Sequence, residues 1–147
     1  MVINRTEIEV RYQETDQMGV VYHANYLVWF EIGRTKYIEQ LGFKYTEMEE
    51  KDVVSPVIDA QISYKKPIKY GDQVFVETWL EDYDGIRTTY GYRVLNGTGE
   101  LAVRGETKHV VVKKDSFKPV LLRKVHPEWD KAYHQQIKGD TESGIRD

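Results

Sequence analysis

The sequence predicts an α+β fold in which a curled antiparallel β-sheet wraps around one long central helix. Two observations carry this prediction. Apolar residues recur at spacings of three and four over residues 24–41, as in an amphipathic helix, and they alternate with polar residues in five other runs, as in half-buried strands. A single helix with a broad apolar face needs a sheet to cover it, so the sheet is expected to curl around the helix.

The first element is a strand over residues 5–12, where Val10 and Tyr12 fall on one side and Glu9 and Arg11 on the other. The helix follows over residues 24–41, and Gly42 ends it. At 1.5 Å per residue this helix is about 27 Å long.

Four further strands are expected to form an antiparallel meander after the polar segment of residues 47–52. They cover residues 58–64, 74–80, 86–95 and 100–113, with turns at Asp84-Gly85 and at Asn96-Gly97-Thr98-Gly99. A short amphipathic helix is expected over residues 127–138. The chain is therefore read as one domain over residues 1–138, followed by a flexible tail over residues 139–147.

Composition excludes several functional classes. The chain has no cysteine, which removes disulfides, thiolate metal sites and cysteine nucleophiles, and its three histidines after residue 100 lack metal-ligand spacing. The net charge of −3 argues against a nucleic-acid partner. The apolar stretch of residues 20–33 is interrupted by His23, Asn25 and Glu31, so no membrane span is expected, and the cytoplasm is the predicted location.

Residues 11–34 hold the polar groups that are best placed for chemistry. Asp16 lies in a loop around Gly19, seven residues before His23, where the helix is expected to begin. A carboxylate that faces a helix N-terminus, which attracts anions, suits reactions at a carbonyl group. The alternative is that Asp16 only stabilises a turn, as aspartate often does in loops.

Residues 12–26 contain the pattern Tyr12-x-x-x-Asp16-x-x-Gly19-x-Val21-Tyr22-His23-x-Asn25-Tyr26. The residue types and their spacing in this pattern resemble the signature of the 4-hydroxybenzoyl-CoA thioesterase family. The resemblance implies the hotdog fold and hydrolysis of an acyl-CoA thioester, with no cofactor beyond the CoA of the substrate. It also implies a homodimer or homotetramer whose active site lies between subunits.

On this resemblance Asp16 is the nucleophile or the general base. Desolvation under a bound acyl group would raise the basicity of its carboxylate, which then attacks the thioester directly or deprotonates a water molecule. The backbone N–H of His23 is expected to stabilise the oxyanion, and the His23 ring is a second possibility. Tyr12 is the third catalytic candidate, because the resemblance places a tyrosine here near the active site; it is expected to reach the loop from the end of the first strand, or else to be a buried core residue.

Other positions have weaker support. Tyr26 and Glu31 are candidates for the acyl pocket, although an ion pair between Glu31 and Arg34 is the simpler explanation for the latter. Glu14 is expected to face solvent.

Lys65, Lys66 and Arg87 are the candidates for binding the phosphates of CoA, and the alternative is that they are solvated strand ends. The strand that begins the meander, with the preceding Ser55, is expected to leave an edge free for a second copy of the chain.

Two other functions remain open from the sequence. One is a hotdog dehydratase that acts on hydroxyacyl thioesters, although those enzymes pair a histidine with an acidic residue in a different motif. The other is a module that binds acyl thioesters without turnover, and tight binding without hydrolysis would identify it.

Overall fold

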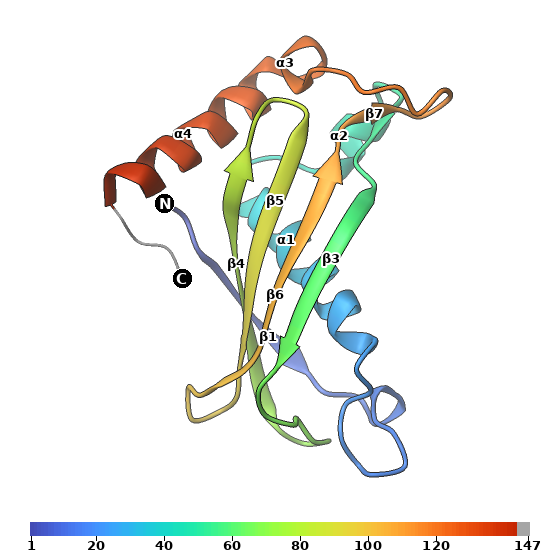
Figure 1. Cartoon of the computed structure of the whole chain (residues 1–147), viewed down its shortest axis with the longest axis vertical. Helices are drawn as coiled ribbons and strands as arrows, with labels where there is room; N and C mark the ends of the chain where they lie inside the picture. Colours follow the sequence, from blue (N-terminus) through green and yellow to red (C-terminus); the bar gives the residue numbers. More distant parts are fainter. Residues whose placement is uncertain (144–147) are drawn as a thin grey trace.

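The computed structural model describes residues 1–143, and a five-stranded antiparallel sheet covers one long helix, α1 (Asn25–Gln40) (Figure 1). This confirms the predicted α+β class and the hotdog arrangement. The strand order is β1-β4-β5-β6-β3. The five strands are β1 (Asn4–Glu9), β3 (Val57–Tyr64), β4 (Gln73–Tyr83), β5 (Arg87–Leu95) and β6 (Leu101–Val110).

Helix α1 matches its predicted range to within one residue at each end. Its buried side is aromatic and packs against the inner face of the sheet; the buried residues include Tyr26, Trp29, Phe30, Tyr37 and Ile38. The helix lies close to β4 because Gly33 has no side chain: a Cβ there would collide with Thr78. Gly42 ends the helix with a φ of 98°, which only glycine adopts readily.

The predicted four-strand meander is wrong in one respect. β4, β5 and β6 are consecutive neighbours, but β3 pairs with β6 rather than with β4, in the register Ile62↔Gly105. β1 occupies the side of β4 that β3 would need, with Ile8 opposite Val74. β3 therefore lies at an outer edge of the sheet, as the prediction of a free strand edge requires.

Three segments were missed or misjudged. Residues 45–49 form a short helix, α2 (Tyr45–Glu49), which overlaps the polar segment of residues 47–52, where no element was expected. The last predicted strand divides at Val111, and its end, β7 (Val112–Lys113), pairs with β2 (Val53–Val54) in a separate two-stranded sheet.

The C-terminal part adds α3 (Leu122–Val125) and α4 (Pro127–Ser143). Trp129 and Tyr133 of α4 are buried against the core. Helix α4 is five residues longer than predicted, and residues 144–147 of the predicted tail lie outside the described residues. No helix in the described part of the chain is long and apolar enough to cross a membrane.

Candidate active site

The loop that carries Asp16 is held against α1 by Glu14. The Glu14 carboxylate accepts hydrogen bonds from Trp29 Nε1 on the helix (2.9 Å) and from the Arg11 backbone N–H (2.8 Å). The backbone carbonyl oxygen of Glu14 accepts hydrogen bonds from the Tyr22 N–H and from Asn25 Nδ2, both at 2.8 Å. Glu14 is only 5% exposed, so the expectation that it faces solvent is wrong.

The same contacts explain why the predicted placement of Tyr12, at the end of a strand or in the core, is wrong. β1 ends at Glu9, and the bond from Arg11 to Glu14 belongs to a 3₁₀ turn, η1 (Tyr12–Glu14). The turn directs the Tyr12 side chain outward, where it is 77% exposed. Tyr12 is therefore neither the end of a strand nor a core residue.

Asp16 occupies a tight loop whose shape its own backbone helps to fix. Its N–H donates to the Val20 carbonyl (2.8 Å), and Gly19, with a φ of 76°, donates back to the Asp16 carbonyl (3.0 Å). One carboxylate oxygen accepts the Met18 N–H at 2.8 Å, so the turn-stabilising role considered as an alternative is present. The other oxygen has no hydrogen-bond donor among the described residues, which leaves it free for chemistry.

The N-terminus of α1 offers uncapped donors. The N-cap residue is Ala24, which has no side-chain oxygen for capping, and the first turn of the helix contains no acidic residue. In the described part of the chain, no carbonyl or side chain accepts the N–H of His23 or of Ala24. The positive end of the helix dipole and these free donors together form a site suited to an anion.

A hollow of about 280 Å³ adjoins this helix end. Its lining includes Val21, His23, Tyr26, Tyr64, Lys65 and Lys66. The Tyr64 hydroxyl donates to the carbonyl of His23 (3.2 Å), which ties the end of β3 to the residue before the N-cap of α1. Burial, followed by the neighbouring Tyr64, raises the pKa of Tyr26 to about 12, so this phenol stays neutral. The structure thus brings His23 and Tyr26 to one surface, with His23 exposed.

A second cavity, of about 190 Å³, lies along the C-terminal half of α1. Its lining includes Glu31, Arg34, Ser55, Tyr90 and His109. No ion pair joins Glu31 to Arg34 in the described part of the chain. Arg34 instead donates from Nη1 to the Tyr92 hydroxyl, at 3.5 Å. Glu31 is thus left at the rim of this cavity, whereas Tyr26, the other acyl-pocket candidate, lines the hollow at the helix N-terminus.

A buried polar chain fixes His109 in this cavity wall. Its ring nitrogens lie 3.0 Å from Thr107 Oγ1 and 3.1 Å from the Ser55 carbonyl, and Thr107 also contacts the Tyr92 hydroxyl at 2.6 Å. The ring is 2% exposed. Burial lowers the pKa of His109 to about 4, so the ring is neutral at pH 7.

His109 should make the protein less stable in mild acid. In the unfolded chain its pKa is about 6.5, so between pH 6.5 and 4 the unfolded state binds more protons than the folded state, whose His109 pKa is about 4. The free energy of unfolding should therefore fall by up to about 3 kcal/mol as the pH is lowered through this window. Urea denaturation at pH 7 and pH 4.5 measures the difference. His109→Gln should reduce it, and an unchanged difference in that variant would contradict the assignment.

The three candidate cations for CoA do not lie together. Lys65 and Lys66 follow the end of β3, and the Lys66 ammonium pairs with Glu100, which lowers the pKa of that carboxyl to about 2. Arg87 begins β5 at the opposite end of the sheet, where it pairs with Asp84 (3.8 Å). Among the described residues, no group of three histidine or acidic side chains is placed to hold a metal ion.

Comparison with known proteins assigns this architecture to a family. Residues 10–129 match the model of the thioesterase-like superfamily. The YneP protein of Bacillus subtilis is 55% identical over 94% of this chain and 100% of its own length. The acyl-CoA thioesterase YbgC of Haemophilus influenzae is 34% identical over 80% of this chain and 86% of its own.

Solved structures agree with the sequence relatives. A DHNA-CoA thioesterase from Staphylococcus aureus is 44% identical and superposes with a TM-score of 0.93, covering 100% of this chain and 98% of its own. A family match over most of the chain, together with relatives at this level of identity, settles the classification. The chain belongs to the thioesterase-like superfamily.

Proposed function

We propose that this chain hydrolyses the thioester bond of an acyl-CoA, giving a free carboxylic acid and CoA. The observation that carries the proposal is the Asp16 loop, hydrogen-bonded onto an uncapped helix N-terminus. The names of the YbgC relative and of the S. aureus structure support it, since both are thioesterases acting on CoA esters. The reaction needs no cofactor, and a cytoplasmic location stays a prediction of the sequence.

In the proposed reaction the carbonyl oxygen of the thioester faces the free N–H groups of His23 and Ala24. These donors are preorganised and stabilise the negative charge that develops on the oxygen. The free oxygen of Asp16 either attacks the carbonyl carbon, forming a mixed anhydride that water then hydrolyses, or removes a proton from an attacking water. In both routes the C–S bond breaks and CoA leaves as the thiolate.

We further propose that the acyl group is aromatic. The sequence motif resembles enzymes acting on 4-hydroxybenzoyl-CoA, and the S. aureus relative is named for DHNA-CoA. The second cavity supports an aromatic acyl group: at about 190 Å³ it is too small for a long aliphatic chain, Tyr90 and His109 offer ring faces, and Arg34 offers hydrogen-bond donors.

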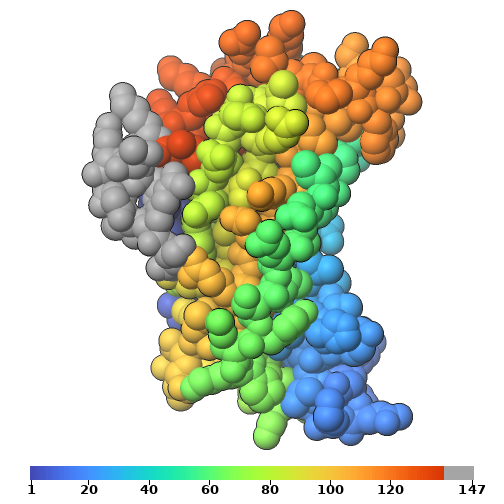
Figure 2. All heavy atoms as spheres, in the orientation of Figure 1, coloured from blue at the N-terminus to red at the C-terminus, as the bar shows by residue number. Residues whose placement is uncertain are grey.

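The functional unit is proposed to be a homodimer built on β3. This strand is an edge of the sheet, and seven of its eight residues are exposed. A bulge interrupts its alternation between Val57 and Asp59. Large exposed apolar residues gather on β3 and on the adjoining α1, which lie side by side in Figure 2: Leu27, Val28, Ile32, Val57, Ile58 and Tyr64. Unpaired edges with apolar neighbours favour pairing with a second copy.

Such pairing would complete the active site. Two antiparallel β3 strands related by a two-fold axis place the Tyr64 end of one beside the Val57 end of the other. Tyr64 adjoins His23, and Ser55, just before Val57, lines the second cavity. The cavity of one protomer, with Glu31 at its rim, would then receive the acyl group of a thioester held at Asp16 of its partner.

A charge in this interface should separate the protomers. Val28→Lys puts a cation on the exposed side of α1, and it should weaken the dimer at least tenfold and lower activity in parallel, because burying an unpaired charge costs more than the ~1.4 kcal/mol behind a tenfold change. Sedimentation velocity measures the assembly. Gln135→Lys adds the same charge on an exposed residue of α4, which packs against β4 rather than β3, and serves as the control. A fully active monomer would overturn the shared site.

Lys65 and Lys66 should contribute to CoA affinity. Replacing both with glutamine should raise KM severalfold and leave kcat nearly unchanged, the pattern for lost uniform binding. KM for the natural protein should also rise with salt, since salt screens the attraction to phosphates. Steady-state kinetics at two ionic strengths measures both effects. An unchanged KM in the double variant would show that other residues bind the phosphates of CoA.

The proposed function is tested by a screen of short, long and aromatic acyl-CoAs, with released thiol as the readout. Hydrolysis of an aromatic acyl-CoA is the expected result. Tight binding of CoA esters without thiol release would favour the binding module, and hydration or dehydration of a hydroxyacyl thioester would favour the dehydratase.

A further inference from the structure

Two tyrosines form an exposed aromatic pair beside the Asp16 loop. Tyr12 is 77% exposed and Tyr70 is 61% exposed, although their rings contact each other. The centroids are 5.8 Å apart and the planes meet at 84°. In edge-to-face geometry the pair itself covers neither face of one ring and only one face of the other. Neither ring contributes to the buried core, so the fold does not explain the pair.

The pair is attached directly to the catalytic loop. Tyr12 lies in η1, four residues before Asp16. Tyr70 ends a segment that runs beside the loop, where the Val21 N–H donates to the Ile68 carbonyl at 2.7 Å and Val20 bridges Lys69. The same segment begins at Lys65, in the wall of the hollow at the helix N-terminus. The aromatic pair therefore lies just beyond the end of that hollow.

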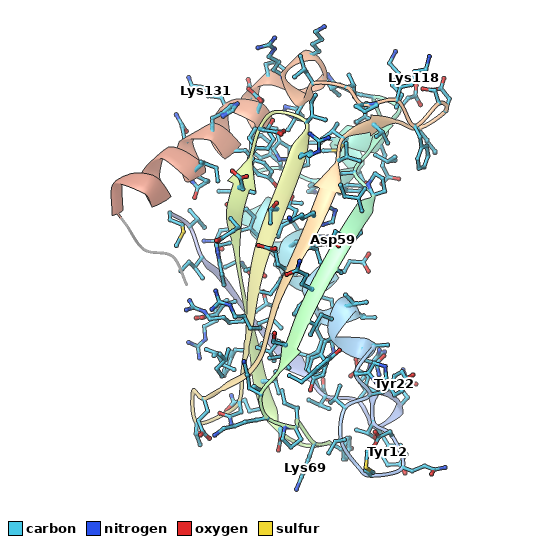
Figure 3. All side chains as sticks on the ribbon, in the orientation of Figure 1. Tyr12, Tyr22, Asp59, Lys69, Lys118 and Lys131 are labelled. Atoms are coloured by element: carbon cyan, nitrogen blue, oxygen red, sulfur yellow. The ribbon has the colours of Figure 1, made fainter. Side chains whose placement is uncertain are left out.

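Lysine side chains lie near the two rings. Figure 3 shows Lys69 and Tyr12 at the same end of the molecule, with the Lys69 side chain directed outward. Asp72 accepts the backbone N–H of Lys69, at 2.9 Å, rather than its ammonium group. In the described part of the chain, neither Lys65 nor Lys69 forms an ion pair. Open aromatic faces next to unneutralised ammonium groups are the chemistry that binds a nucleobase and its phosphates.

We propose that Tyr12, Tyr70 and Lys69 bind the adenosine end of CoA. This rests on the proposed function, which places the thioester at the N-terminus of α1. The pantetheine arm would follow the hollow past Lys65 and Lys66, the adenine would stack on the Tyr12–Tyr70 pair, and Lys69 would contact a phosphate. The aromatic pair is thus a recognition site for the leaving group rather than part of the chemistry.

The test compares two thioesters of the same acyl group: the CoA ester, and the N-acetylcysteamine ester, which lacks the nucleotide. The ratio of their kcat/KM values measures what the adenosine end contributes. In the double variant Tyr12→Ala/Tyr70→Ala this ratio should fall about tenfold, the size expected for the loss of one base stacked on an aromatic ring. The double variant Tyr12→Phe/Tyr70→Phe keeps both rings and should keep the ratio. Equal losses with both esters, or no loss with either, would overturn the proposal.

Two further measurements separate this proposal from its alternatives. Lys69→Gln should raise KM for the CoA ester severalfold, whereas Lys118→Gln, at the opposite end of the molecule (Figure 3), should not. If the natural protein hydrolyses neither ester, the proposed function fails, but calorimetry with CoA still decides the binding site: tenfold weaker binding by the alanine variant supports it and equal binding overturns it. A change of oligomeric mass in the alanine variant would assign the rings to a subunit contact instead and overturn the proposal.

Discussion

Asp16→Asn should lower kcat by about 10²-fold or more, the range expected when a catalytic base or nucleophile is lost. The substitution keeps the side-chain shape and the oxygen that accepts the Met18 N–H, so the loop should keep its conformation. It removes the negative charge and the basic oxygen that has no hydrogen-bond donor among the described residues. Single-turnover release of thiol from an acyl-CoA measures the chemical step directly.

Asp82→Asn is the matched control for this variant. Asp82 is an exposed residue of β4, which β5 and β6 separate from β3, so its replacement removes the same charge away from the Asp16 loop and from the proposed interface. Its activity should match that of the natural protein, and both variants should have the same thermal unfolding temperature. An Asp16→Asn variant with near-normal turnover would show that another group performs the reaction.

His23→Pro should have the second-largest effect, a loss of about 10² to 10³ in kcat, as found when one donor of an oxyanion site is removed. Proline has no N–H, so it removes the proposed donor itself. No carbonyl or side chain in the described part of the chain accepts this N–H, so the fold should tolerate its loss. Single-turnover kinetics and circular dichroism together separate a catalytic loss from misfolding.

His23→Ala provides the comparison, because it removes the ring and keeps the backbone donor. The ring contacts Tyr22, with centroids 4.3 Å apart, and no hydrogen bond links it to Asp16 among the described residues. We therefore expect a much smaller loss than in the proline variant. Equal losses in the two variants would assign the catalytic role to the ring.

The sequence predicts the elements whose periodicity is set by burial on one face. The range of α1 was correct because a stripe of large apolar residues must meet the sheet. The loop position of Asp16 was predictable for a different reason. Gly19 and the neighbouring motif residues restrict the local backbone geometry. The order of the strands was not predictable from alternation alone, because alternation defines a buried face and not which neighbour supplies the hydrogen bonds.

The errors at Glu14 and Tyr12 share one physical cause. A charged residue in a loop is expected to face solvent unless it has buried partners, and the partner of Glu14, Trp29 Nε1, lies 15 residues away along the chain. The resulting turn also exposes Tyr12. The local sign of this turn in the sequence was a glutamate three residues after Arg11, which is the spacing of a capping box. Tertiary partners of this kind are visible only in the folded chain.

The most direct test of the central claim is a crystal structure of the Asp16→Asn variant with an intact aromatic acyl-CoA. We expect the thioester carbonyl oxygen to lie within hydrogen-bonding distance of the His23 or Ala24 N–H, with the carbonyl carbon beside the residue 16 side chain. A thioester bound away from the N-terminus of α1, with residue 16 facing solvent, would contradict the proposed mechanism.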